Sequence, residues 1–174
     1  MKCGTVAVVG RANAGKSTLV NVLVGEKIAI VSPKPQTTRD RIFGVLTTDD
    51  YQIVFEDTPG VYKSSGELNA RMQKAAVRTA EETDVILFVL DGHEGVREDD
   101  LLLAKKFAKG GVPLVIAFTK IDIMPKEKLP EELMKLSGLE GVSDIVPVSA
   151  RKGKNIDELL KVLLSHLTES DYVF

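Results

Sequence analysis

The segment at residues 10–17, GRANAGKS, has the spacing of a loop that binds the phosphates of a nucleotide. Its glycines let the main chain curl so that successive N–H groups point at phosphate oxygens, and a helix that starts near the lysine adds its positive N-terminal field. We expect Lys16 to reach the β- and γ-phosphates and Ser17 to bind Mg²⁺. The pattern therefore predicts a nucleoside triphosphate site and leaves the base open.

A second motif, DTPG at residues 57–60, directly follows a predicted strand. The carboxyl end of that strand is expected beside the phosphate loop, where the Asp57 carboxylate can hold the metal through a water molecule. Gly60 lets its N–H approach the γ-phosphate closely. The same residues also suit a plain turn. Their position one strand after the phosphate loop favours the nucleotide site.

The motif TKID at residues 119–122 indicates which base is bound. A carboxylate at Asp122 can accept both the N1–H and the N2–H of guanine, a pair of donors that adenine lacks. The stem of Lys120 is expected under the base plane, and Ser149 and Ala150 are expected to donate backbone N–H groups to the guanine carbonyl oxygen. An ATP-dependent enzyme is therefore the less favoured alternative.

Short apolar runs alternate with amphipathic stretches along the chain, which is typical of a mostly parallel sheet with helices on both faces. Residues 41–48 and 51–56 are expected to form an antiparallel hairpin, and the apolar run 84–90 predicts a strand buried on both faces. We expect six strands and five helices in one α/β domain over residues 1–174. The other expected strands are 5–9, 112–118 and 144–148, and the expected helices lie near 17–23, 72–79, 101–107, 131–136 and 156–167.

Composition excludes several classes of protein. The chain of 174 residues carries 23 Lys and Arg against 25 Asp and Glu, a net charge of −2, which argues against coating nucleic acid by bulk attraction but allows local basic patches. The single cysteine, Cys3, cannot form an internal disulfide. The longest apolar runs fall far short of the ~18 residues that span a bilayer. We expect a cytoplasmic protein without a transmembrane segment.

These motifs together resemble the translation-factor-related (TRAFAC) class of GTPases, and within it the Era family of the TrmE-Era-EngA-like group. The similarity extends from GRANAGKS through SPKPQTTRDR at residues 32–41, DTPGVY and DVILFVLD to VSARKGKNIDEL. It implies a three-layer P-loop NTPase G domain with strand order 2-3-1-4-5-6 and an antiparallel second strand. It also implies a GTP-hydrolysing switch that acts in assembly of the small ribosomal subunit.

The resemblance assigns roles to individual residues. It makes Thr38 the switch threonine that closes on Mg²⁺ and the γ-phosphate. The expected catalytic residues are Lys16, Thr38 and Gly60, and the expected metal ligands are Ser17, Thr38 and Asp57. The residues expected to bind the nucleotide are Asn13, Ala14, Gly15, Lys16, Ser17, Thr18, Thr119, Lys120, Asp122, Ser149, Ala150 and Arg151.

Two residues bear on the rate of hydrolysis. Val61 stands where many GTPases have the glutamine that positions the attacking water, and valine cannot hydrogen-bond, so the unassisted rate should be low. Asn13 resembles the asparagine that binds K⁺ in potassium-activated relatives. We hypothesise modest stimulation by K⁺; a local cap within the loop is the alternative for Asn13.

The chain also departs from the Era pattern. Thr119 replaces the usual asparagine that bridges the base loop to the phosphate loop, so weaker guanine affinity is expected. The resemblance implies that Era proteins carry a C-terminal KH domain that binds small-subunit ribosomal RNA, and we expect residues 1–174 to lack it. The alternatives are a nucleotide-sensing module with little turnover and the G domain of a related family such as EngB or MnmE. The resemblance further allows a peripheral location at the membrane.

Overall fold

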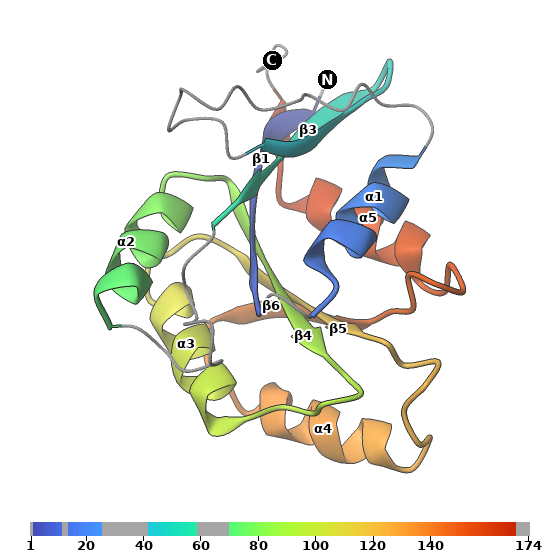
Figure 1. The fold of residues 1–174 in the computed structure, drawn as a ribbon. Helices are drawn as coiled ribbons and strands as arrows, with labels where there is room; N and C mark the ends of the chain where they lie inside the picture. The colour runs from blue at the N-terminus through green and yellow to red at the C-terminus, as the bar shows by residue number, and fades with distance from the viewer. Residues whose placement is uncertain (1, 12–13, 26–41, 59–69, 170–174) are drawn as a thin grey trace.

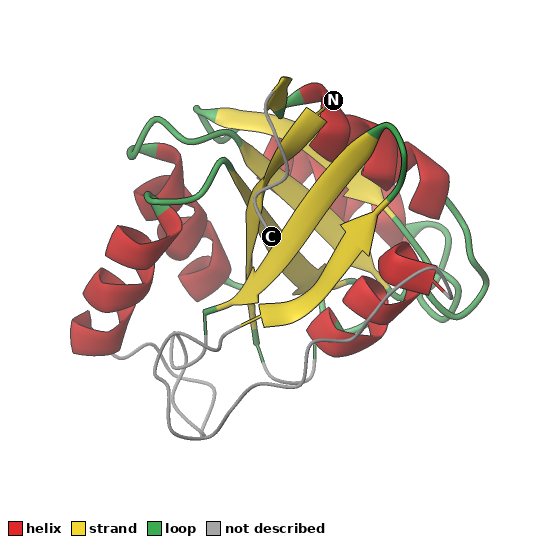
Figure 2. Ribbon diagram, turned by 90° about the horizontal axis from the view of Figure 1, so that it is seen from above, coloured by secondary structure: helices red, strands yellow, loops and turns green. Residues whose placement is uncertain are grey.

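The computed structural model describes residues 2–11, 14–25, 42–58 and 70–169, and Figures 1 and 2 show a sheet with helices on both of its faces. The strands are β1 (Lys2–Gly10), β2 (Ile42–Thr47), β3 (Tyr51–Asp57), β4 (Val85–Asp91), β5 (Leu114–Thr119), β6 (Val142–Pro147) and β7 (Thr168–Glu169). The helices are α1 (Lys16–Val24), α2 (Ala70–Ala80), α3 (Glu98–Ala108), α4 (Lys128–Ser137) and α5 (Ile156–Ser165).

The strand order β2-β3-β1-β4-β5-β6 confirms the expected topology. Strands β2 and β3 are antiparallel, as the hairpin predicted, and β1 pairs in parallel with both β3 and β4. The expected count of six strands is wrong for the described chain, because β7 adds a seventh. Since β4 pairs with β1 only from Val6 onward, Lys2 and Cys3 are left to pair with β7. The predicted end of the last helix at residue 167 is also wrong: α5 ends at Ser165, before the chain enters β7.

Two hydrophobic clusters lie on opposite faces of the sheet. Along β4 the side chains alternate, so that Val85, Leu87 and Val89 join the cluster under α1 and α5, whereas Ile86, Phe88 and Leu90 join the cluster under α2, α3 and α4. Every residue of β4 is buried. This double burial explains why β4 is a continuous apolar run without polar alternation, as the sequence predicted.

The parallel strands end at one edge of the sheet, and the described residues of the phosphate-loop, DTPG and TKID motifs lie there. Gly10 ends β1 with a φ of 154°, and a Cβ atom at this position would lie 2.5 Å from the carbonyl oxygen of Val89 on β4. Only glycine therefore allows this approach between the two strands where the chain leaves the sheet. The carboxyl edge of a parallel sheet is where ligands bind in folds of this kind.

Candidate functional site

The phosphate-loop end of the site is built from β1, α1 and β3. Gly15 takes the left-handed conformation, with a φ of 95°, and α1 begins at the next residue, so its N-terminal N–H groups open toward the loop. Lys16 Nζ lies 3.3 Å from Asp57 Oδ1, and its side chain is only 12% exposed. Ser17 and Thr18 are exposed on the first turn of α1. An ammonium and a carboxylate therefore meet at the sheet edge, beside the first turn of α1.

Thr58 fixes the chain directly after β3. Its N–H and its hydroxyl both donate to the carbonyl of Val8, at 3.3 and 3.0 Å, and the residue is 1% exposed. Because Val8 is also the register partner of Asp57, this pair of bonds holds Asp57 beside β1. From the sequence, Thr58 is predicted only as a member of the DTPG motif, with no role of its own.

A pocket of about 190 Å³ lies at the other end of the site, where the loops after β5 and β6 meet the phosphate loop. It is lined by Ala14, Gly15, Thr18, Thr119, Lys120, Asp122, Ile123, Ala150 and Arg151. All but one of these residues were predicted to bind the nucleotide. The exception is Ile123, which is 50% exposed; its apolar side chain beside Asp122 is the signal that could have identified it.

Ser149 orients Asp122 through its side chain. Its hydroxyl donates to Asp122 Oδ1 at 2.9 Å and accepts the N–H of Lys152 at 3.1 Å, and the residue is fully buried. The backbone N–H of Ser149 donates to the carbonyl of Lys154, which changes the expectation that this N–H contacts the base. Of the two predicted backbone donors, the N–H of Ala150 is the one that the loop geometry leaves for a ligand.

Thr119 connects the two ends of the site. Its hydroxyl lies 2.9 Å from the carbonyl of Ala14 in the phosphate loop and 3.0 Å from the carbonyl of Leu90 on β4. The threonine hydroxyl has one hydrogen to donate to these two carbonyl oxygens, whereas the NH₂ group of an asparagine has two hydrogens to donate. The bridge to the phosphate loop therefore persists with threonine, with a single donor.

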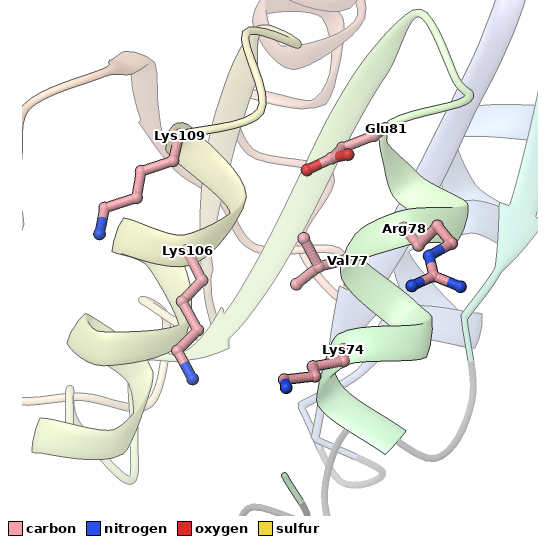
Figure 3. A pocket seen from close by; sticks show the side chains of 6 residues that line it. All are labelled: Lys74, Val77, Arg78, Glu81, Lys106 and Lys109. Atoms are coloured by element: carbon pink, nitrogen blue, oxygen red, sulfur yellow. The ribbon is translucent and has the colours of Figure 1, made fainter. Parts of the chain in front are cut away.

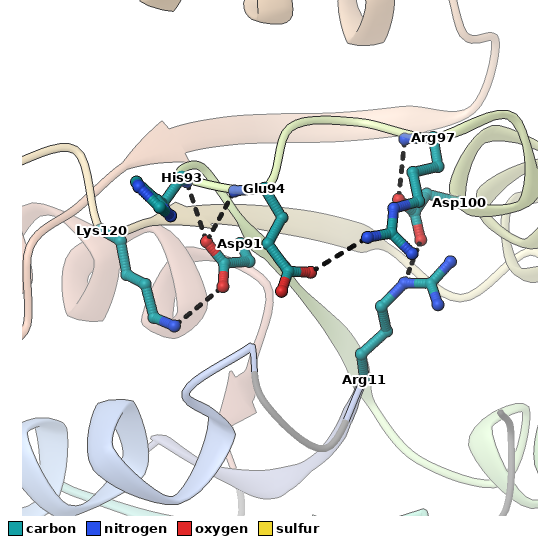
Figure 4. Close-up of polar contacts among 7 residues, drawn as sticks. All are labelled: Arg11, Asp91, His93, Glu94, Arg97, Asp100 and Lys120. Carbon is teal, nitrogen blue, oxygen red and sulfur yellow. Dashed lines mark hydrogen bonds and ion pairs between the residues drawn. The ribbon is translucent and has the colours of Figure 1, made fainter. Parts of the chain in front are cut away.

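Asp91, at the end of β4, pairs with Lys120 (Figure 4). Asp91 Oδ2 accepts a hydrogen bond from Lys120 Nζ at 2.8 Å, and Oδ1 accepts the N–H groups of His93 and Glu94. Lys120 has a φ of 61°, a conformation uncommon for residues other than glycine. Asp91 is not among the residues predicted from the sequence, although its place at the carboxyl end of a buried strand could have identified it.

Arg11 attaches the phosphate loop to α3. Its Nε lies 3.4 Å from Asp100 Oδ1, and the carboxylate of Asp100, which is 2% exposed, also accepts the N–H of Arg97 (Figure 4). The buried carboxylate therefore caps the start of α3 and holds the first side chain of the phosphate loop. Neither partner was singled out from the sequence.

Asn13, Thr38, Gly60 and Val61 lie outside the described residues. The remaining predicted residues are brought to one edge of the sheet in two groups. Lys16, Ser17 and Asp57 form the group at the phosphate loop, and Thr18, Thr119, Lys120, Asp122, Ser149, Ala150 and Arg151 form the group at the pocket, with Ala14 and Gly15 between them.

Comparison with known families agrees with this geometry. The sequence profile described as "50S ribosome-binding GTPase" matches residues 5–120, two thirds of the chain. The chain belongs to this family. Among curated proteins it is similar to GTPase Era of Thermoanaerobacter sp. (strain X514), 42% identical over 97% of the chain, and to GTPase Era of Clostridium novyi (strain NT), 40% identical over 97%. The chain spans 56% and 57% of the length of these two relatives.

Solved structures give the same result. An Aquifex aeolicus Era variant bound to GDP and AlF4⁻ matches with a TM-score of 0.77 and 42% identity. The match covers 100% of this chain and 60% of the Era chain. Era in complex with MgGDPNP and a segment of 16S ribosomal RNA has a TM-score of 0.78 at 42% identity, again with 100% and 60% coverage. The predicted resemblance to the Era family is confirmed. Within the described part of the chain, no helix combines the length and apolar character needed to cross a membrane.

Proposed function

We propose that residues 1–174 form one G domain that binds GTP and hydrolyses it to GDP and phosphate as a molecular switch. Three contacts along one edge of the sheet carry this proposal: Lys16 pairs with Asp57 at 3.3 Å, the Ser149 hydroxyl donates to Asp122 at 2.9 Å, and the Thr119 hydroxyl donates to the carbonyl of Ala14 at 2.9 Å. A nucleoside triphosphate has the same layout, with phosphates at one end and a base at the other. The Era relatives solved with GDP and AlF4⁻ and with MgGDPNP support the proposal.

Guanine is the base that the pocket suits. The Asp122 carboxylate would accept the N1–H and N2–H donors of guanine, while the hydroxyl of Ser149 fixes its orientation. We assign the N–H of Ala150 to the guanine carbonyl oxygen, and the stem of Lys120 to the face of the base. Arg151, Ile123 and Thr18 would complete the walls of the pocket.

The phosphate-loop group suits a triphosphate with Mg²⁺. Gly15 and Lys16 would offer N–H groups at the start of α1, and the Lys16 ammonium would bind the β- and γ-phosphates. Mg²⁺ prefers oxygen ligands and keeps several waters, so the exposed Ser17 hydroxyl with Asp57 acting through water fits it. When bound, the ion would neutralise charge on the phosphate oxygens. By family resemblance we propose that Thr38 and Gly60 close on the γ-phosphate.

A potassium ion is part of the proposal through Asn13. Because Val61 cannot position water by hydrogen bonding, a monovalent cation near the β- and γ-phosphates would supply charge stabilisation. We expect modestly faster GTP hydrolysis in KCl than in NaCl at equal ionic strength. Equal rates in the two salts would contradict the K⁺ site and leave GTP binding unaffected.

The switch is proposed to act in the cytoplasm on the assembling small ribosomal subunit. The relative solved with a segment of 16S ribosomal RNA supports this partner. The two nucleotide states would differ in the order of the switch segments, which the partner would read. We assign residues 1–174 the role of the G domain and not that of the RNA-binding KH domain of Era proteins.

Single-turnover hydrolysis of GTP by the 174-residue chain tests the proposed function. We expect slow release of phosphate above the protein-free rate with Mg²⁺, lost in Lys16→Ala and retained in Lys126→Ala, whose exposed lysine lies near α4. Small ribosomal subunits are expected to change the rate. GTP binding without turnover, with and without subunits, would instead indicate a nucleotide-sensing module and contradict the proposed hydrolase.

A further inference from the structure

A groove between α2 and α3 concentrates positive charge away from the nucleotide site. It has a volume of about 370 Å³ and is lined by Lys74, Val77, Arg78, Glu81, Lys106 and Lys109 (Figure 3). Four of these side chains are cationic and one is a carboxylate, in a chain whose 25 acidic residues outnumber its 23 basic ones. The groove is therefore a local basic patch on a slightly acidic molecule.

The single carboxylate does not cancel this charge. A Cβ atom on Gly110 would lie 2.7 Å from the Cγ of Glu81, so the Glu81 side chain rests against the turn that follows α3. In Figure 3, Glu81 lies at one end of the groove, and the side chains of Lys74 and Lys106 extend toward the other. Within the described residues, Lys74, Arg78 and Lys109 form no ion pair with a carboxylate.

Helix stability explains only part of this arrangement. Arg78 in the last turn of α2 and Lys106 in the last turn of α3 do complement the helix dipoles. Lys74 lies earlier in α2, where that effect has faded, and it stands one turn from Arg78, a like-charge spacing that destabilises a helix. Lys74 therefore adds positive charge to the groove without a gain in helix stability.

The position of the groove separates it from the nucleotide. Both helices lead into the amino ends of the strands that follow them, β4 and β5, so Arg78, Lys106 and Lys109 lie toward the edge opposite the phosphate loop. Pocket residues such as Asp122 and Ala150 lie at the carboxyl edge. A ligand of the groove would therefore leave the GTP site open.

We propose that the α2–α3 groove binds the phosphodiester backbone of RNA. Among the described residues, Val77 is the one apolar side chain that lines the groove, so they offer an acidic helical peptide no row of apolar anchors. A phosphodiester chain needs only spaced cations, and the exposed lysine and arginine side chains can each meet one phosphate. The choice of RNA as the source of the phosphates rests on the proposed function.

Fluorescence anisotropy with a labelled single-stranded 30-nucleotide RNA tests this groove in the 174-residue chain. The variants are Lys74→Gln/Arg78→Gln on α2 and Lys106→Gln/Lys109→Gln on α3. The matched control is Lys126→Gln/Lys128→Gln, which removes the same charge from exposed positions at α4. Thermal melting and binding of a fluorescent GDP are measured for each variant.

We expect both groove variants to lower the association constant at least about tenfold at low salt, and the control to change it less than about twofold. The slope of log K against log salt should fall by roughly 1.4 in each groove variant, which is ~0.7 for each lost contact to a single strand. Equal losses in all three variants, a loss confined to one helix, or absence of RNA binding would overturn the proposal. Binding of polyglutamate in place of RNA would assign the groove to an acidic protein and overturn it too. If the unmodified chain did not bind GDP, that result would count against the proposed function and not against the groove.

Discussion

Asp91 and Lys120 form an ion pair of 2.8 Å between the carboxyl ends of two neighbouring strands. The carboxylate is 6% exposed and accepts two further hydrogen bonds from the backbone of its own loop. The ion pair therefore fixes the Lys120 side chain against the end of β4. We propose that Asp91 is a positioning residue, which acts on the base through the lysine.

Replacing Asp91 by Asn should weaken guanine nucleotide binding. The amide keeps the acceptor for the loop N–H groups but loses the charge that attracts Lys120, so we expect the Kd for GDP to rise about tenfold, or ~1.4 kcal/mol. The rate of hydrolysis of bound GTP should change little. Isothermal titration calorimetry measures the affinity. Glu94→Gln, which removes an exposed partner of Arg97, is the matched control and should leave Kd unchanged. Equal affinity in Asp91→Asn and the parent chain would refute the positioning role.

The hydroxyl of Thr119 should stabilise both the fold and the site. Thr119→Val keeps the shape of the 3% exposed side chain but removes the donor shared by the carbonyls of Ala14 and Leu90. We expect a loss of about 1–3 kcal/mol in the free energy of unfolding, measured with urea, and weaker GTP binding. Thr119→Ser retains the hydroxyl and should keep most of both properties. If the valine variant matched the serine variant, the bridge would have no energetic role.

Glu56 should make stability depend on pH. Burial, and then the charge of Glu82, raise the pKa of the Glu56 carboxyl above its ordinary value of 4.5. The ionised carboxyl therefore opposes folding at neutral pH, and the penalty disappears as the pH falls below 4.5, where folded and unfolded chains are both protonated. Glu56→Gln should raise Tm at pH 7 and give no gain below pH 4.5. Glu82→Gln should give a smaller gain, since it removes only the lesser cause. A pH-independent gain for Glu56→Gln would contradict this cause.

The rule that ligands bind at the carboxyl edge of a parallel sheet was enough to predict much of the site from sequence. Asp57, Asp122 and Ser149 each follow a strand, and the structure brings them to that edge. The strand order came from the family resemblance, and the buried β4 from its unbroken apolar run. These features depend on local pattern and on a general property of the fold.

What sequence could not supply are contacts between segments distant along the chain. The pair of Arg11 and Asp100 joins the phosphate loop to α3, and neither residue belongs to a spacing pattern that predicts the other. The N–H of Ser149 is taken by Lys154 because of a tight loop whose bonds only the folded chain reveals. Strand β7 spans two residues, too few for any periodicity to appear.

We propose above all that Asp122 selects the guanine base of a nucleotide whose phosphates are held by Lys16. Competition binding of GTP and XTP to the parent chain and to Asp122→Asn tests it most directly, because the amide exchanges an acceptor for a donor and xanthine offers the complementary group. We predict that the parent chain prefers GTP and that Asp122→Asn prefers XTP. An unchanged preference for GTP in Asp122→Asn would contradict the account.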